Sequence, residues 1–578
     1  MGSLAVRSAV LLLLLLALPL ALGEYWAFQL GLFFLYAIAA LGVALCWGQA
    51  GFLPLGQALF VGLAAYLSGA ALIQWGEAWW VFLLLPFAAI AAGALAFLLG
   101  LIIFRGRSES GPYFAIITLA IALLAFQVAN SWNAVTGGYN GMKAIPGLPG
   151  LEGFSDVYYL AAVALACAVA LCGWLVQAPL GTLWRAIALN ERRVAYFGYD
   201  TAMLKAIAFG LSGVLAGIAG ALYAPQQGLV TPELVGFALS ADLVIWVAVG
   251  GRKRVLGPVL GAVLVGILSA ELRERTYYWD LIVAAVFVFV VLYAPGGIGA
   301  LLAPLERLLP GRRKALEPLR APASKAPPRS AVTLAIDGVS AAAGEVRILD
   351  RLSLAVARPG IYCLIGPNGA GKTSTFNMLT GELRAQAGEV RLDGDILSKP
   401  TPYRLARRGV GRKFQIPSVF GELSIDENLR IAVWSARTSL LDWLRPATRR
   451  WDTPVMAALR GRYPFLDDGG RLASALSHGE RQVLELSMAL ITEPRLLLLD
   501  EPCAGLSSEE TAQVREVIRW ARDTLGLSVV IIEHDMALVK QLAEHVFVLH
   551  QGRLLAEGDV AAIRSDPRVH EVYVGAAE

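Results

Sequence analysis

The sequence feature that most constrains the fold is the octapeptide Gly-Pro-Asn-Gly-Ala-Gly-Lys-Thr at 366–373. It follows an apolar, strand-like segment at 361–365 and opens a helix-like segment at 373–379, which is the context that a phosphate-binding loop requires. Its glycines let backbone N–H groups approach phosphate oxygens, Lys372 adds a charge at the β- and γ-phosphates, and the Thr373 hydroxyl can ligate Mg²⁺. We therefore expect the phosphates of a nucleotide to be bound by Gly366, Pro367, Asn368, Gly369, Ala370, Gly371, Lys372, Thr373 and Ser374.

Two further motifs follow in a fixed order. Leu-Ser-His-Gly-Glu-Arg-Gln occupies 476–482, about 110 residues downstream, and Leu-Leu-Leu-Leu-Asp-Glu-Pro occupies 496–502. Asp500 ends an apolar strand and is suited to hold Mg²⁺, directly or through water, while Glu501 is placed to polarise an attacking water molecule. Two acids at a strand end can be merely structural, but Pro502 and the upstream motif favour catalysis.

The order and spacing of these motifs resemble the ATPase of ABC transporters, which implies an α/β P-loop domain that binds ATP and Mg²⁺. The resemblance implies that Gln415 is a lid residue and a Mg²⁺ ligand, and that His534, after the strand at 529–532, senses the γ-phosphate. It places the D-loop at 505–507. It also implies that Ser477, His478 and Gly479 form a signature turn, whose N–H groups bind a nucleotide held by a second ATPase.

The chain departs from the usual pattern of this family in two places. In the signature, His478 replaces a Gly and Glu480 replaces a Gln, which the branched-chain amino acid and urea ATPases tolerate. The strand pair before the P-loop usually carries an aromatic residue that stacks on adenine, but the matching tract, 340–346, contains none. Nucleotide affinity is therefore expected to depend on the phosphates.

Charge divides the chain into two parts. Residues 1–304 carry 13 Lys/Arg and 12 Asp/Glu, whereas residues 305–578 carry 36 and 33. We therefore predict an all-α polytopic membrane domain at 1–304, a basic, Pro-rich linker at 305–330 with a mild attraction to membrane lipid, and the ATP-binding domain at 331–578. The near-neutral balance gives no indication of nucleic-acid binding, and the five Cys lack the spacing of a zinc site or a disulfide framework.

About ten spans are expected in the first part. Residues 1–23 resemble a secretory signal, but a first membrane helix is the simpler interpretation because further spans follow at once. Positive charges at 105–107, 185–193 and 252–254 place the N-terminus and the ATPase in the cytoplasm; Arg273 and Arg275 are exceptions that we expect to pair locally. The 48–57 stretch is a candidate broken helix. The apolar windows are 8–22, 28–47, 57–73, 81–104, 112–130, 158–178, 203–224, 238–250, 256–272 and 279–299; the 238–250 window is short for a full crossing.

Several tracts of this part resemble the permeases of branched-chain amino acid and urea importers. They are 111–120, 136–141, 216–223 and 244–252. The resemblance implies that 181–200 is a coupling helix that passes motion to an ATPase; the alternative is a surface helix that merely connects two spans. The tract around Trp246, together with Lys413 in 411–420, is closer to the urea branch.

The chain is thus interpreted as a permease–ATPase fusion of a bacterial inner-membrane ABC importer. The expected cargo is urea or a short-chain amide, with branched-chain amino acids as the alternative. The resemblance implies an external solute-binding protein and a second permease–ATPase chain, because hydrolysis needs two facing ATPases. Two rivals stay open: a half-transporter exporter, which normally has six long helices, and an ATPase-driven regulatory or assembly module without cargo.

Overall fold

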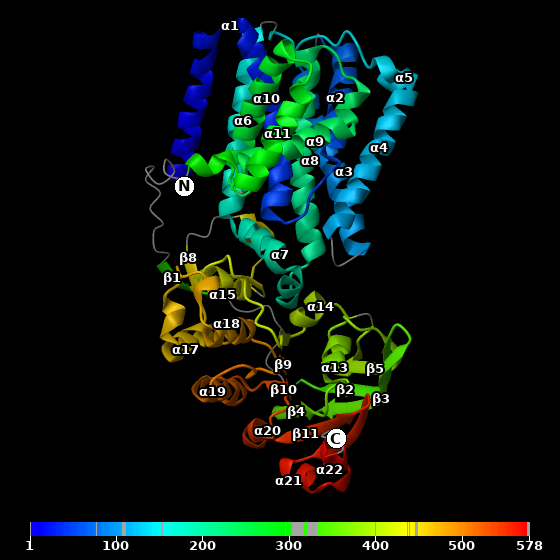
Figure 1. The fold of residues 1–578 in the computed structure, drawn as a ribbon, viewed down its shortest axis with the longest axis vertical. Helices are drawn as coiled ribbons and strands as arrows, with labels where there is room; N and C mark the ends of the chain where they lie inside the picture. Colours follow the sequence, from blue (N-terminus) through cyan, green and yellow to red (C-terminus); the bar gives the residue numbers. More distant parts are fainter. Residues whose placement is uncertain are drawn as a thin grey trace. The chain divides into compact units, whose positions relative to one another are not determined.

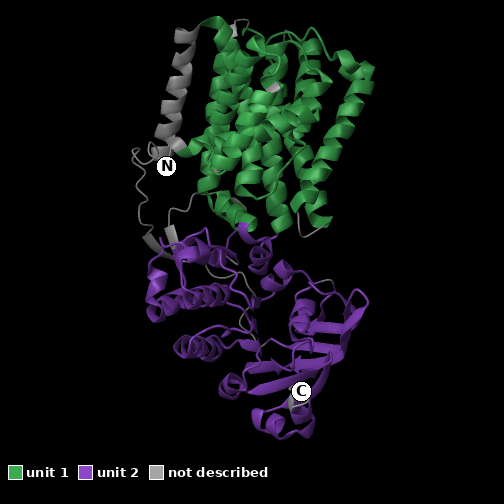
Figure 2. Ribbon diagram, viewed as in Figure 1, with its two compact units in different colours: residues 1–188, 201–315, 443–446 green, residues 189–200, 316–442, 447–578 purple. Residues whose placement is uncertain are grey.

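The computed structural model describes most of the chain (Figure 1). Contacts divide it into two compact units (Figure 2). Unit 1 contains residues 1–188, 201–315 and 443–446, and unit 2 contains residues 189–200, 316–442 and 447–578. The described residues are 2–76, 78–106, 111–151, 154–294, 296–302, 317–321, 332–398, 400–435, 437–438, 440–444 and 449–574.

The predicted linker at 305–330 falls mostly outside the described residues, as do both of its predicted boundaries and Arg107. Within it, strand β1 (Glu317–Arg320) pairs in parallel with β8 (Arg449–Asp452) of the same unit. This part of the linker is thus a strand rather than an extended tether.

Unit 1 is helical. Helix α1 changes direction at Gly23, whose φ of 79° is outside the helical range, so the windows 8–22 and 28–47 form two successive helices. The elements are α1 (Gly2–Ala44), η1 (Leu45–Gln49), α2 (Gln57–Trp75), α3 (Val81–Gly106), α4 (Gly111–Ser131), α5 (Asn133–Thr136), η2 (Gly138–Asn140), α6 (Phe154–Gln177), α7 (Pro179–Tyr196, which continues into unit 2), α8 (Thr201–Gln227), η3 (Pro232–Val235), α9 (Phe237–Gly250), α10 (Leu256–Arg275), α11 (Trp279–Tyr293) and η4 (Ile298–Leu302).

Helix α8 lies at the centre of unit 1 because it packs on α3, α2 and α1. Small residues make this close packing possible: a Cβ on Gly213 would lie 2.5 Å from the Ala96 Cβ of α3, and one on Gly220 would lie 1.9 Å from the Val61 carbonyl oxygen of α2. In a bilayer, where lipid tails are as apolar as leucine, such close backbone approach is a main source of helix association.

Among the described residues, seven helices are long and apolar enough to cross a membrane. The windows 238–250 and 279–299 correspond to shorter helices, α9 with 14 residues and α11 with 15. The window 8–22 is helical, but its side chains are outside the described set. The total of ten spans therefore stays a prediction.

The expected break in the 48–57 stretch is present. A π-helical turn, η1, ends at Gln49, and the chain is then irregular until α2 begins at Gln57. A Cβ on Gly48 would lie 1.8 Å from the Arg252 carbonyl oxygen, and Gln49 Nε2 donates to the Lys253 carbonyl at 3.3 Å. This non-helical backbone is surrounded by protein, as the membrane interior requires. The expected local pairing occurs for Arg275, whose guanidinium lies 3.0 Å from the Glu271 carboxylate, whereas Arg273 lies over the ring of Trp279, 4.5 Å from its centroid.

Unit 2 contains a six-stranded sheet, order β12-β11-β4-β10-β9-β7, and a four-stranded sheet, order β3-β2-β5-β6. Four strand-like windows of the sequence, 333–338, 346–356, 361–365 and 389–393, match β2 (Leu334–Ala343), β3 (Val346–Val356), β4 (Ile361–Ile365) and β5 (Ala385–Leu392). The further elements are β2 (Leu334–Ala343), β3 (Val346–Val356), β4 (Ile361–Ile365), α13 (Lys372–Leu379), β5 (Ala385–Leu392), β6 (Asp395–Ile396), α14 (Pro402–Arg407), β7 (Val410–Lys413), α15 (Ile425–Ser435), α16 (Leu440–Leu444), α17 (Pro454–Arg462), η5 (Pro464–Asp467), η6 (Ala473–Ala475), α18 (His478–Ile491), β9 (Leu496–Asp500), α19 (Ser508–Leu525), β10 (Ser528–Ile532), α20 (Met536–Leu542), β11 (His545–His550), β12 (Arg553–Gly558), α21 (Val560–Ser565) and α22 (Pro567–Val574).

Residues 189–200 belong to unit 2, although the chain places them between apolar helices of unit 1. Helix α7 is interrupted at Asn190 (φ −159°, ψ 89°), and the remaining turn ends before Gly198, which has a φ of 86°. A glycine in this left-handed conformation is a common way for a helix to end. We refer to residues 189–200 as the coupling segment.

Candidate functional site

The predicted site residues follow the carboxyl ends of four adjacent parallel strands. In the sheet, Lys413 of β7 is in register with Leu499 of β9, Asp500 of β9 with Ile532 of β10, and Ile532 with Leu364 of β4. The strands thus end at one edge, where ligands of open α/β sheets bind. This topology brings the P-loop, the Gln415 loop, the acidic pair and His534 to the same edge.

The P-loop is formed as the sequence predicts, between β4 and α13. Gly366 passes so close to β11 that a Cβ on it would lie 2.2 Å from the Leu549 carbonyl oxygen. The Lys372 ammonium donates to the carbonyls of Gly366 at 2.7 Å and Pro367 at 3.1 Å, so its charge is held over the loop. Burial lowers the pKa of Lys372, and the charges of Glu501 and Asp500 oppose that shift.

The acidic pair differs in burial and in backbone conformation. Asp500 is only 3 % exposed, and burial raises its pKa, with the charge of Glu501 acting in the same direction while Arg412 opposes it. Glu501 has a φ of 44°, a conformation that is costly for a residue with a side chain. Its N–H donates to the Ile532 carbonyl at 3.0 Å, which holds the turn in place.

The structure brings together the three predicted catalytic residues. Gln415 Nε2 donates to Glu501 Oε2 at 2.7 Å, and His534 Nδ1 lies 3.5 Å from Glu501 Oε1. The His534 side chain is 63 % exposed, so it is accessible to a ligand. Glu501 therefore lies between the amide and the imidazole, within reach of both.

Oxygen donors for a metal ion lie in the same region. The Asp500 carboxylate, the Thr373 hydroxyl in the first turn of α13 and the Gln415 amide are the kind of hard oxygen ligands that Mg²⁺ prefers. A bound Mg²⁺ would add a positive charge next to the buried Asp500 carboxylate. The donor chemistry thus fits Mg²⁺, which when bound neutralises charge on the phosphates.

Glu533 is a residue of this edge that the sequence analysis did not select. It is 3 % exposed, and its Oε2 accepts the His534 N–H at 3.3 Å. Burial raises its pKa to about 7, opposed by His534 and reinforced by Glu501. Its position directly before the predicted sensor histidine is the sequence signal that could have identified Glu533.

The signature turn forms the start of α18. Ser477 caps this helix: its Oγ accepts the Glu480 N–H at 3.1 Å, and the Glu480 carboxylate accepts the Ser477 N–H at 2.8 Å. Gly479 lies against α19, since a Cβ on it would be 1.8 Å from Glu510 Oε1. Helix α18 packs on α15, α17 and β7, whereas α13 lies on the other side of β9 (Figure 1).

The coupling segment lies against the residues that precede Gln415. Arg193 is 1 % exposed and donates to the Arg412 carbonyl at 2.7 Å. The Arg412 guanidinium in turn donates to the Tyr196 hydroxyl at 3.1 Å. Arg192 pairs with Glu382 near the end of α13. Arg407 Nε donates to the Gly198 carbonyl at 2.9 Å.

Two protein families match the chain. "Branched-chain amino acid transport system / permease component" matches residues 25–291, and "ABC transporter" matches residues 349–504. The "High-affinity branched-chain amino acid transport ATP-binding protein BraF" of Pseudomonas aeruginosa is 36 % identical over 250 residues, which are 42 % of this chain and 98 % of that protein. The chain belongs to the ABC transporter family.

Other proteins are also similar to the C-terminal part of this transporter. LivG of Escherichia coli, another "High-affinity branched-chain amino acid transport ATP-binding protein", is 35 % identical over 250 residues, 42 % of this chain and 98 % of LivG. The solved structure of the ADP conformation of MJ1267, an ATP-binding cassette of an ABC transporter, is 28 % identical with a TM-score of 0.36 and covers 43 % of this chain and all of that one.

The transporter is thus a permease fused to an ABC ATPase. It is an importer subunit that binds ATP and Mg²⁺ and couples ATP hydrolysis to transport. It is a multi-pass protein of the inner membrane, and its ATPase is cytoplasmic. Importers of this family work with paired transmembrane and ATPase subunits and with a solute-binding protein. The permease match at 25–291 is not expected of a half-transporter exporter.

Proposed function

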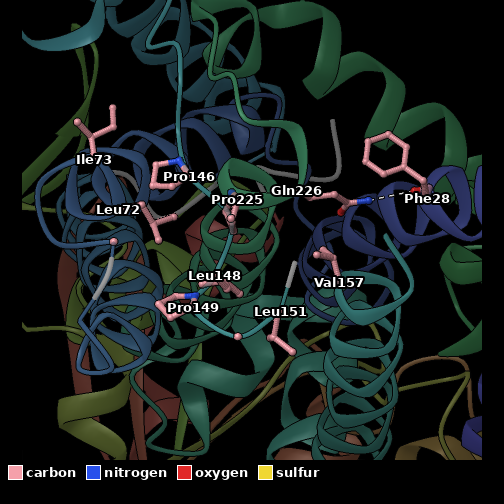
Figure 3. Close-up of a pocket in the computed structure, with 13 residues that line it drawn as sticks. Phe28, Leu72, Ile73, Pro146, Leu148, Pro149, Leu151, Val157, Pro225 and Gln226 are labelled. Atoms are coloured by element: carbon pink, nitrogen blue, oxygen red, sulfur yellow. Dashed lines mark hydrogen bonds between the residues drawn. The ribbon is translucent and has the colours of Figure 1, made fainter. Parts of the chain in front are cut away.

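We propose that the cargo of this importer is a small, uncharged solute with N–H donors, urea or a short-chain amide. The observation that carries the proposal is a cavity of about 820 Å³ in unit 1 (Figure 3). Among the described residues that line it, none carries a charged side chain. An ionic cargo would meet no counter-charge from these described residues, whereas an uncharged one loses less hydration on entry.

One polar side chain of the cavity is suited to an N–H donor. Gln226 is 8 % exposed, and its Nε2 donates to the Phe28 carbonyl at 3.0 Å (Figure 3). Its Oε1 has no hydrogen-bond partner among the described residues. A buried acceptor without a partner costs free energy, and an amide or urea N–H would supply that partner if the side chain turned this shielded oxygen toward the cavity. Leu72, Leu148 and Val157 add apolar side chains to the lining of this open pocket.

The cavity lies at helix ends that the predicted orientation places outside the cell. It is bordered by the end of α2, the start of α6 and the end of α8, whose other end follows the coupling segment. Buried polar groups elsewhere in unit 1 are mostly uncharged, such as Gln57, Ser212 and Ser240. This agrees with an uncharged cargo, because charges inside a membrane normally mark an ionic pathway.

A branched-chain amino acid is the second candidate cargo. It is favoured by the relatives BraF and LivG, which are ATP-binding proteins of branched-chain amino acid transport, and by the family that matches residues 25–291. The cavity is also large enough for a leucine-sized molecule.

In the ATPase, the proposed roles follow the geometry of the strand edge. Glu501 would orient the attacking water, Gln415 and His534 would contact the γ-phosphate region, and Mg²⁺ would be held by Thr373, Gln415 and Asp500. Ser477, His478 and Gly479 act on the nucleotide of a second permease–ATPase chain, a proposal supported by the exposed position of Ser477 and His478 at the start of α18, where backbone N–H groups can bind phosphate.

The cargo proposal is tested by reconstitution in liposomes with the partner chain and the cognate solute-binding protein. Urea or a short amide should enter only with ATP, and uptake should stop when either partner is left out. Gln226→Leu should raise the KM for uptake, whereas Gln177→Leu, an exposed glutamine at the end of α6, should not. Uptake of leucine or valine but not urea would transfer the assignment to the second candidate.

A further inference from the structure

A single buried carboxylate lies between the coupling segment and the loop that carries Gln415. Glu485 is on α18, two turns after the signature turn, and it is fully buried. Its Oε1 lies 3.4 Å from the Arg193 guanidinium, and its Oε2 lies 4.0 Å from the Lys413 ammonium. Three elements that are distant in the sequence therefore share one negative charge.

The two cations depend on this carboxylate. Arg193 and Lys413 are each no more than 1 % exposed. Burial lowers the pKa of both, and for both the charge of Glu485 is the first effect that opposes burial. Two like charges buried side by side are unfavourable unless an opposite charge lies between them. Loss of the Glu485 charge would therefore push the coupling segment and the Lys413 strand apart.

Phe414 transmits the position of this cluster to the catalytic edge. Its N–H points to Glu485 Oε1 at 3.4 Å, and its ring contacts Tyr196 edge-on, with centroids 5.0 Å apart. The guanidinium of Arg193 lies 5.7 Å from the ring centroid, a cation–π distance. The next residue is Gln415, which is hydrogen-bonded to Glu501. A shift of the coupling segment thus reaches the catalytic carboxylate through directly contacting groups.

We propose that Glu485 is a positioning residue that ties the Gln415–Glu501 contact to the coupling segment through Arg193, so that hydrolysis responds to the state of the permease. The inference rests on the proposed catalytic roles of Gln415 and Glu501. Under this proposal, helix α18 is connected to the signature turn at its start and to the coupling segment at its middle.

The decisive quantity is the stimulation ratio: ATPase activity with the loaded solute-binding protein divided by activity without it. The full transporter with its partner chain is reconstituted in liposomes, and the binding protein is loaded with urea in one arm and leucine in another. The form of the loaded binding protein that stimulates the wild-type transporter is then used for every variant. The result therefore does not depend on which cargo is correct. Glu501→Gln tests the proposed catalytic role separately.

Glu485→Gln should bring the stimulation ratio close to one and lower the solute moved per ATP hydrolysed. Arg193→Met should do the same, and it leaves Glu485 with Lys413 as a neutral pair, so it remains informative if Glu485→Gln does not fold. The double variant should resemble the single variants, because both remove one interaction. Glu485→Asp should restore part of the ratio, which a loss of packing alone would not.

The matched control is a partly buried ion pair of unit 2. Arg437 is 4 % exposed and lies 2.8 Å from Glu493. Glu493→Gln should lower the Tm while the stimulation ratio stays at the wild-type value. A wild-type ratio in Arg193→Met, or effects of Arg193→Met and Glu485→Gln that simply add, would overturn the proposal. If Glu493→Gln lowers the stimulation ratio to the same extent, Glu485 has only a stabilising role, and the proposal is overturned.

Discussion

The Gln415 amide donates a hydrogen bond to the Glu501 carboxylate, with 2.7 Å between Nε2 and Oε2. The contact joins the loop after β7 to the turn after β9, and the second oxygen of Glu501 lies 3.5 Å from His534 Nδ1. Glu501 is therefore held between the two groups that we propose to contact the γ-phosphate of a nucleotide. The consequences of this arrangement can be measured residue by residue.

Glu501→Gln should lower ATP hydrolysis by ~10²-fold or more while ATP still binds, because the amide cannot act as a base or orient water as a carboxylate does. Steady-state ATPase assays and nucleotide titration measure the two properties separately. Near-normal turnover in this variant would contradict the assignment of Glu501. Glu509→Gln, at the exposed start of α19, is a control with the same change of charge.

Lys372→Ala should weaken nucleotide binding, because it removes the charge that the P-loop places at the β- and γ-phosphates. In the structure this ammonium is held by the Gly366 and Pro367 carbonyls, so the loop orients it in advance. Titration of ATP against the purified transporter gives the affinity. Lys540→Ala, in the last turn of α20, is a suitable control. Equal ATP affinity in Lys372→Ala and wild type would count against the loop as the phosphate site.

Glu533 should make stability depend on pH near neutrality. Its pKa is raised from about 4.5 to about 7 in the folded state, so the folded protein binds this proton more tightly than the unfolded chain does. The contribution of Glu533 to the free energy of unfolding is fully present below pH 4.5, is lost as the pH rises toward 7, and is absent above pH 7. The difference corresponds to roughly 3 kcal/mol at most.

Glu533→Gln should remove this dependence, because the amide stays neutral at every pH. Thermal unfolding of the nucleotide-free protein from pH 5 to pH 8 gives the comparison. The variant should gain Tm relative to wild type as pH rises. Parallel Tm curves for the two proteins would show that Glu533 does not titrate in this range.

Motif order was enough to predict much of the strand edge, because the P-loop, Asp500 and His534 each lie at the end of an apolar strand, whereas Gln415 follows the polar strand β7 and was placed by the family resemblance alone. Asp500 and His534 could be placed in this way from the sequence alone. The contact between Arg193 and Glu485 could not, because 292 residues separate them and neither lies in a motif that names its partner. Span lengths were also difficult to predict: the 279–299 window included Gly296 and Gly297, which lie beyond the end of α11 at Tyr293.

The hairpin before the P-loop should give weak discrimination between ATP and GTP. Strands β2 and β3 pair up to Ala343 and Val346, and the turn at Gly344 and Glu345 joins them. No aromatic side chain is available on this tract, so base stacking, worth about 1–3 kcal/mol per base, is missing from this position. Competition binding of ATP against GTP measures the preference. A strong preference for adenine in the wild type would mean that another residue or chain supplies the contact.

Introducing an aromatic residue into this hairpin tests the same idea through an increase in ATP affinity. Ala343 is exposed next to the turn, so Ala343→Tyr adds a ring without displacing a packed side chain. If the hairpin faces the base, this variant should bind ATP about tenfold more tightly, which corresponds to about 1.4 kcal/mol of stacking. Ala343→Leu supplies apolar area without a π face and should gain much less. Equal affinities for the Tyr and Leu variants would show that the hairpin does not stack on the base, and nucleotide affinity would then depend on the phosphate contacts of the P-loop.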